Sequence, residues 1–321
     1  MLSRVAENLY WMSRNIERAE NLARLLGVGF DLELDSGGLA SNGHGDGPLE
    51  RVLTILANRD AYERAHGPAD RNRDAMLRFL TFEGKHPQSI IGMIARAREN
   101  ARGVQESISA EAWSHVNRLY LYLSGAKAQR RFEASPVQFF ERVKHACILF
   151  DGLIDSTLPR NEVFYFIQLG RHLERVDQIS RIIAAESRTL HEPETGPVPP
   201  LRLVHWTSLL QSCSAYESYL RTYHDRIEPH GVVRYLVLDP DFPRAVRFCV
   251  TRCRDSLHEI SGGDVDGYGS EAERRLGRLD GELRYVDVGE IFDRGVGSYL
   301  RGLQEACSRI GDEIHHTYFA I

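Results

Sequence analysis

The chain repeats part of its own sequence. Residues 14–26 align without a gap with residues 171–183, a shift of 157, with identity at four positions and conservative replacement at eight more. Two shorter blocks, at 61–63 and 79–87, recur in the same order at shifts of 154 and 156 residues. Three collinear matches predict two homologous halves, about 1–158 and 159–321, related by a pseudo-twofold axis. A period of this length is far too long for a solenoid.

Apolar residues recur at helical spacing through almost the whole chain. From Ser3 a stripe continues over about seven turns and ends near Gly27 and Gly29. No segment alternates as strands do, so we expect an all-α helical bundle built from the two halves. A Gly-rich stretch at 35–47 predicts a loop, and the Pro-rich stretch 191–200 predicts a linker. Further helices are expected at 48–65, 70–81, 87–108, 110–132, 136–157, 162–189, 200–227, 230–237, 243–260, 270–284 and 289–317.

Composition excludes several classes of protein. The chain of 321 residues is 42% hydrophobic and 26% charged, which is typical of a globular protein and not of a disordered one. A net charge of −5 gives no basic field, so nucleic acid is a poor expectation as a partner. No run approaches the ~18 apolar residues of a spanning helix, and Glu7 interrupts any secretory leader. We therefore expect a cytoplasmic protein without membrane contact. Five cysteines without a CxxC pair predict neither disulfides nor a thiolate zinc site.

The repeated helices place carboxylates beside or within their apolar stripes. On a helical wheel Glu20 falls inside the first stripe, and Arg24 and Glu17 flank it. In the second copy, Asp177 falls among apolar residues, with Arg181 and Glu174 beside it. A buried carboxylate needs a partner, and an arginine four residues on is well placed to pair with it.

Three interpretations remain open for these charges: a structural network that fixes helix register, a polar cleft where the two copies meet and bind a charged ligand or partner segment, or a solvated face. A second polar group occurs at Arg98-Glu99-Asn100, and the other half has Arg254-Asp255 instead. This asymmetry suits a single site retained in the first half, and it equally suits neutral drift. The candidate cleft residues are Arg14, Glu17, Arg18, Glu20, Arg24, Arg98, Glu99, Asn100, Arg171, Glu174, Arg175, Asp177 and Arg181.

The sequence predicts neither a metal site nor a cofactor. Glu-x-x-His, the ligand spacing of di-iron bundles, occurs three times, but His66 and His86 immediately precede helix breaks. There is no phosphate-binding loop, no nucleophile elbow and no zinc-protease motif. The aromatic runs Phe139-Phe140 and Phe164-Tyr165-Phe166 are expected to pack in the core. No catalytic residue is assigned on this basis.

The opening block, Ala6-Glu7-Asn8-Leu9-Tyr10-Trp11-Met12-Ser13-Arg14-Asn15-Ile16-Glu17-Arg18-Ala19-Glu20-Asn21, resembles that of the alpha-E domain family. The 98–102 block and the terminal Tyr318-Phe319 extend the resemblance over essentially the whole chain. Glu17-Arg18 matches the family's Glu-Arg motif, and Glu174-Arg175 is the second copy. Family members occur beside, and sometimes fused to, circularly permuted ATP-grasp proteins, often with transglutaminase-like proteins nearby.

The resemblance implies a non-catalytic helical accessory or substrate-docking subunit of an ATP-grasp amidoligase or peptide-modification system. It implies a circularly permuted ATP-grasp protein as the partner, with a peptide or a transglutaminase-like protein as further partners. The alternative is an enzyme in which Glu17 or Glu20, poised by neighbouring arginines, performs acid-base chemistry on an acyl or amide substrate.

Overall fold

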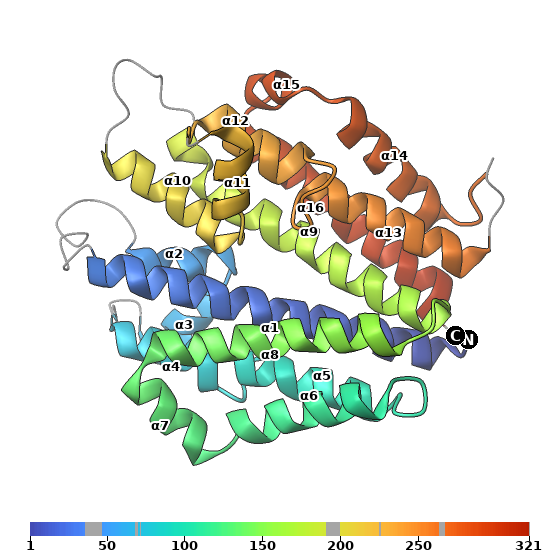
Figure 1. Cartoon of the computed structure of the whole chain (residues 1–321), viewed down its shortest axis with the longest axis horizontal. Coiled ribbons are helices and arrows are strands. Elements are labelled where there is room, and N and C mark those ends of the chain that lie inside the picture. Colours follow the sequence, from blue (N-terminus) through green and yellow to red (C-terminus); the bar gives the residue numbers. More distant parts are fainter. Residues whose placement is uncertain are drawn as a thin grey trace. The chain divides into compact units, whose positions relative to one another are not determined.

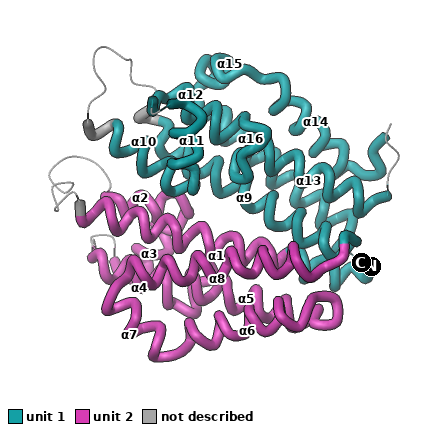
Figure 2. The backbone as a smooth tube through the Cα atoms, in the orientation of Figure 1, with its two compact units in different colours: residues 1–10, 160–321 teal, residues 11–159 magenta. Residues whose placement is uncertain are grey.

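The computed structural model describes residues 1–35, 47–67, 70, 72–190, 200–224, 226–262 and 267–320. Every regular element in these ranges is a helix, which confirms the all-α prediction for this part of the chain. The chain divides into two compact units, unit 1 with residues 1–10 and 160–321 and unit 2 with residues 11–159 (Figure 2). The predicted Gly-rich loop and Pro-rich linker fall almost wholly outside the described residues.

Unit 2 takes up most of the long first helix and continues through seven more. Figure 1 labels them α1 (Ser3–Asp35), α2 (Pro48–Ile55), α3 (Arg59–His66), α4 (Arg73–Phe82), α5 (Ile90–Arg102), α6 (Ala110–Leu123), α7 (Ala126–Ala134) and α8 (Pro136–Thr157). Two predicted starts are confirmed, because Pro48 and Pro136 each occupy the first helical turn. The Ser135 hydroxyl caps α8 by accepting a hydrogen bond from the Gln138 N–H at 3.4 Å.

The first helix does not end near Gly27 and Gly29 as predicted. It continues to Asp35, and both glycines lie within it. A Cβ at Gly29 would lie 3.3 Å from the Leu49 side chain and 3.6 Å from the Pro48 carbonyl. The glycine therefore lets the start of α2 pack closely against α1, and close packing, not helix termination, is its role here.

Several expected helix limits also differ from the structure. The prolines at 87 and 243 precede their helices by a few residues, and α5 is capped instead by Ser89, whose hydroxyl accepts from the Gly92 N–H at 3.1 Å. The helix expected over 110–132 breaks at Ser124 and Gly125 into α6 and α7. Ser124 donates its hydroxyl hydrogen to the Tyr120 carbonyl at 2.9 Å, which satisfies an acceptor at the end of α6.

Unit 1 contains the start of α1 and the helices from residue 160 onward. Its elements are α9 (Glu162–Leu190), α10 (Pro200–Ser212), α11 (Tyr216–Tyr223), α12 (Pro229–Val233), the π-helix η2 (Arg234–Leu238), α13 (Val246–Ser261), α14 (Glu271–Tyr285), α15 (Val288–Asp293), α16 (Val296–Ile314) and the π-helix η3 (His315–Phe319). The expected helices over 200–227 and 289–317 are each divided in two. Within this unit, α9 packs most extensively against α13 and α16 (Figure 1).

Each unit contains a cluster of four side-chain rings with nearly the same geometry. The centroid distances for the first stacked pair are 4.7 Å in both units, and for the second stacked pair 4.5 and 4.8 Å. The edge-to-face contacts joining the pairs are 5.4 and 5.6 Å. The rings are Tyr62, His66, Phe79 and His86 in unit 2, and Tyr219, Tyr223, Tyr235 and Phe242 in unit 1. Two of the histidines considered as metal ligands therefore serve as packed rings.

Acidification is expected to destabilise unit 2 through His86. Burial lowers the pKa of this imidazole below its usual value, and the nearby Arg96 adds to the effect although Glu83 opposes it. Below about pH 6.5 the unfolded chain then binds more protons than the folded chain. As the pH is lowered, this group therefore reduces the free energy of unfolding by at most about 1.4 kcal/mol per pH unit. His86→Phe, which copies Phe242, should reduce the loss of stability between pH 7 and 5, measured by urea unfolding.

His115 provides the comparison for that measurement. Burial lowers its pKa as well, although the contact between its Nε2 and the Ala146 carbonyl at 2.7 Å opposes the shift, so it contributes an acid sensitivity that His86→Phe leaves in place. An unchanged pH dependence in His86→Phe would show that His86 does not titrate differently in the folded and unfolded states.

Candidate functional site

The first Glu-Arg helix carries a buried ion pair. Glu20 and Arg24 are joined between Oε1 and Nη2, and their side chains are 3% and 4% exposed. They lie one turn apart on α1, the spacing at which a carboxylate and a guanidinium meet on a helix. Glu17 is buried one turn before them. The structure thus has the pair that the sequence predicts, with the carboxylate removed from solvent.

The same region holds a cysteine that remains protonated. Burial raises the pKa of the Cys147 thiol on α8, and the negative charges of Asp151 and Glu17 raise it further, while Arg24 opposes them. The thiolate is the nucleophilic form of cysteine. Cys147 is therefore a packing residue of this region and not a nucleophile paired with the glutamates.

The remaining arginines of this block contact an aromatic ring. The guanidinium carbons of Arg14 and Arg18 lie 5.0 and 5.8 Å from the centroid of the Trp11 ring. Arg96 on α5 donates a hydrogen bond to Asn15 at 3.2 Å, and burial together with the charge of Arg18 lowers its pKa. The N-terminal part of this block is thus a cationic and aromatic surface, whereas its C-terminal part is a buried ion pair.

The second Glu-Arg helix is arranged differently. Glu174 is fully buried on α9 and accepts a hydrogen bond from Gln178 Nε2 at 2.9 Å. Asp177 pairs with Arg181 at 2.8 Å, as its spacing predicts, but these side chains are 17% and 37% exposed. The wheel placed Asp177 inside the stripe and Glu174 beside it, and the structure reverses that order. The wheel ignores which neighbouring helices cover each side of α9, and this coverage decides the burial.

Two arginines of this helix bond to atoms outside the motif. Arg175 donates from Nη1 to the Pro243 carbonyl at 3.3 Å, which connects α9 to the segment before α13. Arg171 donates to the Gln168 side chain within the same helix. The Arg175 contact gives the Glu-Arg motif a structural role in unit 1, because it supplies a hydrogen-bond donor to the Pro243 carbonyl just before α13.

The third predicted group forms a surface cluster on α5. Arg98 donates to Asn117 at 2.8 Å and to Glu99 at 2.7 Å, and Arg102 pairs with Glu99 at 2.5 Å. The Arg98 guanidinium also lies 4.9 Å from the Tyr120 centroid. Asn100 is half-buried on the same helix. The sequence indicated Arg98 and Glu99, but it gave no sign of the α6 residues that complete the cluster.

In unit 1 an aspartate of α14 organises the corresponding cluster. Asp280 accepts from Arg254 at 2.5 Å, from Arg284 at 2.8 Å and from Thr251 at 2.7 Å, and it is buried. Its pairing with Arg284 follows from an i, i+4 spacing that could have been noticed in the sequence. Its bond to Arg254 crosses between helices and had no such signal.

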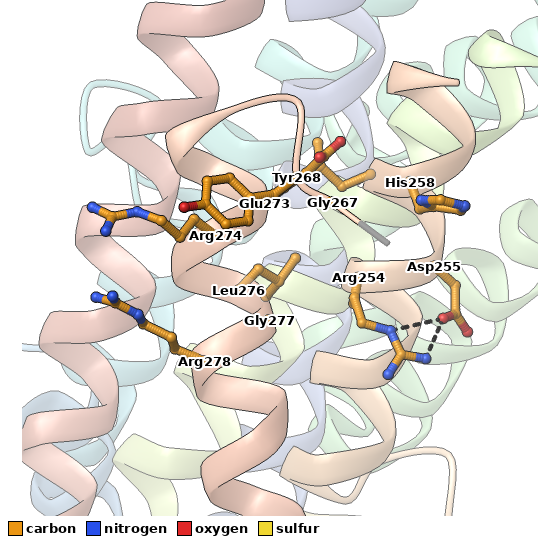
Figure 3. A pocket seen from close by; sticks show the side chains of 11 residues that line it. Arg254, Asp255, His258, Gly267, Tyr268, Glu273, Arg274, Leu276, Gly277 and Arg278 are labelled. Atoms are coloured by element: carbon orange, nitrogen blue, oxygen red, sulfur yellow. Dashed lines mark hydrogen bonds and ion pairs between the residues drawn. The ribbon is translucent and has the colours of Figure 1, made fainter. Parts of the chain in front are cut away.

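A pocket of about 670 Å³ opens beside this cluster, between α13 and α14 (Figure 3). None of the thirteen predicted site residues lines it. Its charged lining comes instead from Arg254, Asp255, Glu273, Arg274 and Arg278. In the described part of the chain, no group of three or more His, Cys, Asp or Glu side chains is placed to hold a metal ion. None of the helices described there has the length and apolar character needed to cross a membrane.

Comparison with known proteins gives a family for the chain. The curated relatives include an uncharacterized protein of Mycobacterium bovis, 23% identical, and one of Mycobacterium tuberculosis H37Rv, 22% identical. Each match covers 99% of this chain but 37% of the relative, so the chain spans little more than a third of their length. No solved structure matches. The model of the Alpha-E family, a predicted alpha-helical domain with a conserved ER motif, matches residues 1–319, and the chain therefore belongs to the Alpha-E family.

Proposed function

We propose that the protein is a non-catalytic helical subunit of an ATP-grasp amidoligase or peptide-modification system, located in the cytoplasm. The observation that carries the non-catalytic part is the burial of Glu17 and Glu20, the acids that the enzyme alternative would use, both 3% exposed, and of the second motif acid, Glu174. Glu20 is sealed in an ion pair with Arg24, and Glu174 is fully buried against Gln178. An acid-base residue must reach a proton of its substrate. Other residues line the pocket between α13 and α14, and also a second pocket of unit 1, of about 520 Å³, between α14 and α16.

The ligase part of the proposal comes from the family resemblance. It implies a circularly permuted ATP-grasp protein as the partner, with a peptide or a transglutaminase-like protein as a further partner. The relatives in Mycobacterium are much longer than this chain, and that additional length would accommodate a fused partner. In this proposal the chain docks the ligase or its substrate and supplies no reacting group.

We further infer that the two halves of the chain, residues 1–158 and 159–321, are copies of one ancestral helical repeat. The matched ring clusters support this, and so does a matched helix junction. Ala57 and Ser214 both have left-handed backbones, with φ of 53° and 51°, 157 residues apart. The next amide in each case donates five residues back at 2.8 Å, Asn58 to Leu53 and Ala215 to Leu210. Non-glycine residues rarely adopt positive φ, so its recurrence at equivalent positions favours common descent.

Co-expression with the neighbouring ATP-grasp protein tests the proposed function. The tagged chain is expected to retain the ATP-grasp protein through affinity purification and size-exclusion chromatography, and to change its ligase turnover. The tag alone, expressed with the same ATP-grasp protein, is the matched control. If the chain elutes alone and leaves turnover unchanged, the proposal is wrong. If the chain alone turns over an acyl or amide substrate, and Glu20→Gln removes that turnover without lowering the melting temperature, the enzyme alternative replaces it.

A further inference from the structure

The pocket between α13 and α14 is bordered by three arginines that come from two helices. Arg254 extends from α13, while Arg274 and Arg278 extend together from successive turns of α14, away from Arg254 in this view (Figure 3). Leu276 lies between these two sides in the same view, and Leu257 and Tyr268 also line the pocket. The volume of about 670 Å³ is in the range of sites that take small organic ligands.

The three guanidinia differ in how their charge is already used. Arg254 is held by Asp255 and Asp280, at 2.6 and 2.5 Å. Arg274 is held by Glu271 through two hydrogen bonds of 2.6 and 2.7 Å. Arg278 is exposed, and no described residue makes a hydrogen bond or ion pair with it. The border of the pocket therefore has two arginines oriented by carboxylates and a third that makes no hydrogen bond to the described residues.

In unit 2, side chains of α6 contact the arginine that we match with Arg254. There Arg98 lies 4.9 Å from the Tyr120 centroid and 6.0 Å from the Trp113 centroid, and it donates to Asn117. If α6 and α14 are matched by their buried positions, Glu273 takes the place of Trp113, Gly277 that of Asn117 and Asp280 that of Tyr120. The positions matched are Ala112 with Ala272, Val116 with Leu276, Leu119 with Leu279 and Leu123 with Leu283. Gly277 in particular contributes no side chain where unit 2 has an amide.

We propose that the pocket between α13 and α14 binds an organic oxyanion, a carboxylate or phosphate group carried on an apolar body. A guanidinium forms paired, charge-assisted hydrogen bonds with either oxyanion, and Arg278 provides one without having to leave another partner. Tyr268, which is 63% exposed, contacts the apolar body, and the rim carboxylates Asp255 and Glu273 repel ligands that carry a second, misplaced negative charge. This site is separate from the thirteen candidate cleft residues, none of which lines the pocket. It does not depend on the proposed ligase partner.

Filling the pocket tests this without disturbing the fold. A Cβ built at Gly277 meets no atom within 4 Å, so Gly277→Phe places a ring in the pocket and removes a helix-weakening glycine. Gly281, one turn further along α14, also has nothing within 4 Å and lines neither described pocket, so Gly281→Phe is the matched control. Both variants should melt at or above the temperature of the parent protein.

Four probes measured by isothermal titration calorimetry on the whole chain separate the two ligand classes. They are the N-acetyl dipeptide amides glutamyl-leucine and phosphoseryl-leucine, with glutaminyl-leucine and seryl-leucine as neutral analogues. One oxyanion probe is expected to bind at least tenfold more tightly than its analogue, and the tighter of the two identifies the carboxylate or the phosphate as the group. Gly277→Phe should weaken that binding at least tenfold, and Gly281→Phe should leave it unchanged.

Charge removal gives an independent readout. Arg278→Gln should weaken the same probe at least tenfold, whereas Arg301→Gln, which removes an exposed arginine of α16 that lines neither pocket, should not. The proposal is overturned if neither oxyanion probe binds better than its neutral analogue at millimolar concentration. It is equally overturned if Gly277→Phe and Arg278→Gln bind as the parent protein does.

Discussion

Replacing Arg24 with methionine is expected to lower the free energy of unfolding by about 3–5 kcal/mol, among the largest effects of any single change in this chain. The substitution removes the guanidinium that pairs with Glu20, while the Glu20 side chain stays 3% exposed. A buried carboxylate that loses its countercharge keeps the unfavourable free energy of desolvation and loses the electrostatic attraction that offset it. Glu20→Gln should also destabilise, since it leaves the guanidinium buried beside a neutral amide. Urea unfolding followed by circular dichroism measures both changes.

The paired replacement distinguishes a broken ion pair from lost packing. In the double variant Glu20→Leu with Arg24→Met, both charges are removed, and the loss should be much smaller than in Arg24→Met alone. If the double variant loses the sum of the single losses, the two side chains are not coupled and the buried pair is not the stabilising unit.

Lysine replacements test why arginine occupies these positions. Arg24→Lys is expected to cost about 1–3 kcal/mol, because a single ammonium cannot satisfy the same set of buried acceptors as a planar guanidinium. Arg181→Lys should cost no more than about 0.5 kcal/mol, because the Asp177–Arg181 pair is partly solvated and one turn apart. Equal effects at the two sites would contradict the difference in burial.

Truncating Phe139 is the second change with a large expected effect. Its ring is fully buried in unit 2 and lies 5.5–5.6 Å from the rings of Phe82, Phe132 and Phe140. Phe139→Ala is expected to destabilise by about 3–5 kcal/mol, since it removes the ring's burial and leaves a cavity among rigid neighbours. Phe139→Leu should recover more than half of that loss.

An exposed aromatic provides the control for this experiment. Tyr285 is 88% exposed at the end of α14, and Tyr285→Ala should change stability by no more than about 0.5 kcal/mol. A small effect of Phe139→Ala would mean that the surrounding rings move into the space left by the Phe139 ring. The near-ultraviolet circular dichroism spectrum would then change although the stability would not.

The helices themselves could largely be predicted from the sequence. Apolar spacing and proline or serine starts located α8 and α9 to within a few residues, because these signals act within one or two turns of the chain. The error at the end of the first helix shows the limit of such local signals. Gly27 and Gly29 lie within α1, where Gly29 meets Leu49 of a different helix. A glycine that serves close packing and one that ends a helix look the same in sequence.

The candidate site divides in the same way. The pairs Glu20–Arg24 and Asp177–Arg181 were predictable, since both depend only on a spacing of four residues along one helix. The bond from Arg254 to Asp280 joins residues 26 apart on two helices, and the pocket beside it depends on how those helices pack. Neither could be read from local spacing.

The sequence by itself determined that this chain is helical, which residues share a helix face, and which acids and arginines lie one turn apart. Those properties depend on backbone geometry and on interactions between near neighbours, and these are the same in any fold. Only the tertiary structure decided that Glu174 is buried more deeply than Asp177, that Arg98 is covered by rings, and that Arg278 borders an open pocket. Burial and cavities are set by which helices pack together, and that packing depends on all the contacting side chains at once.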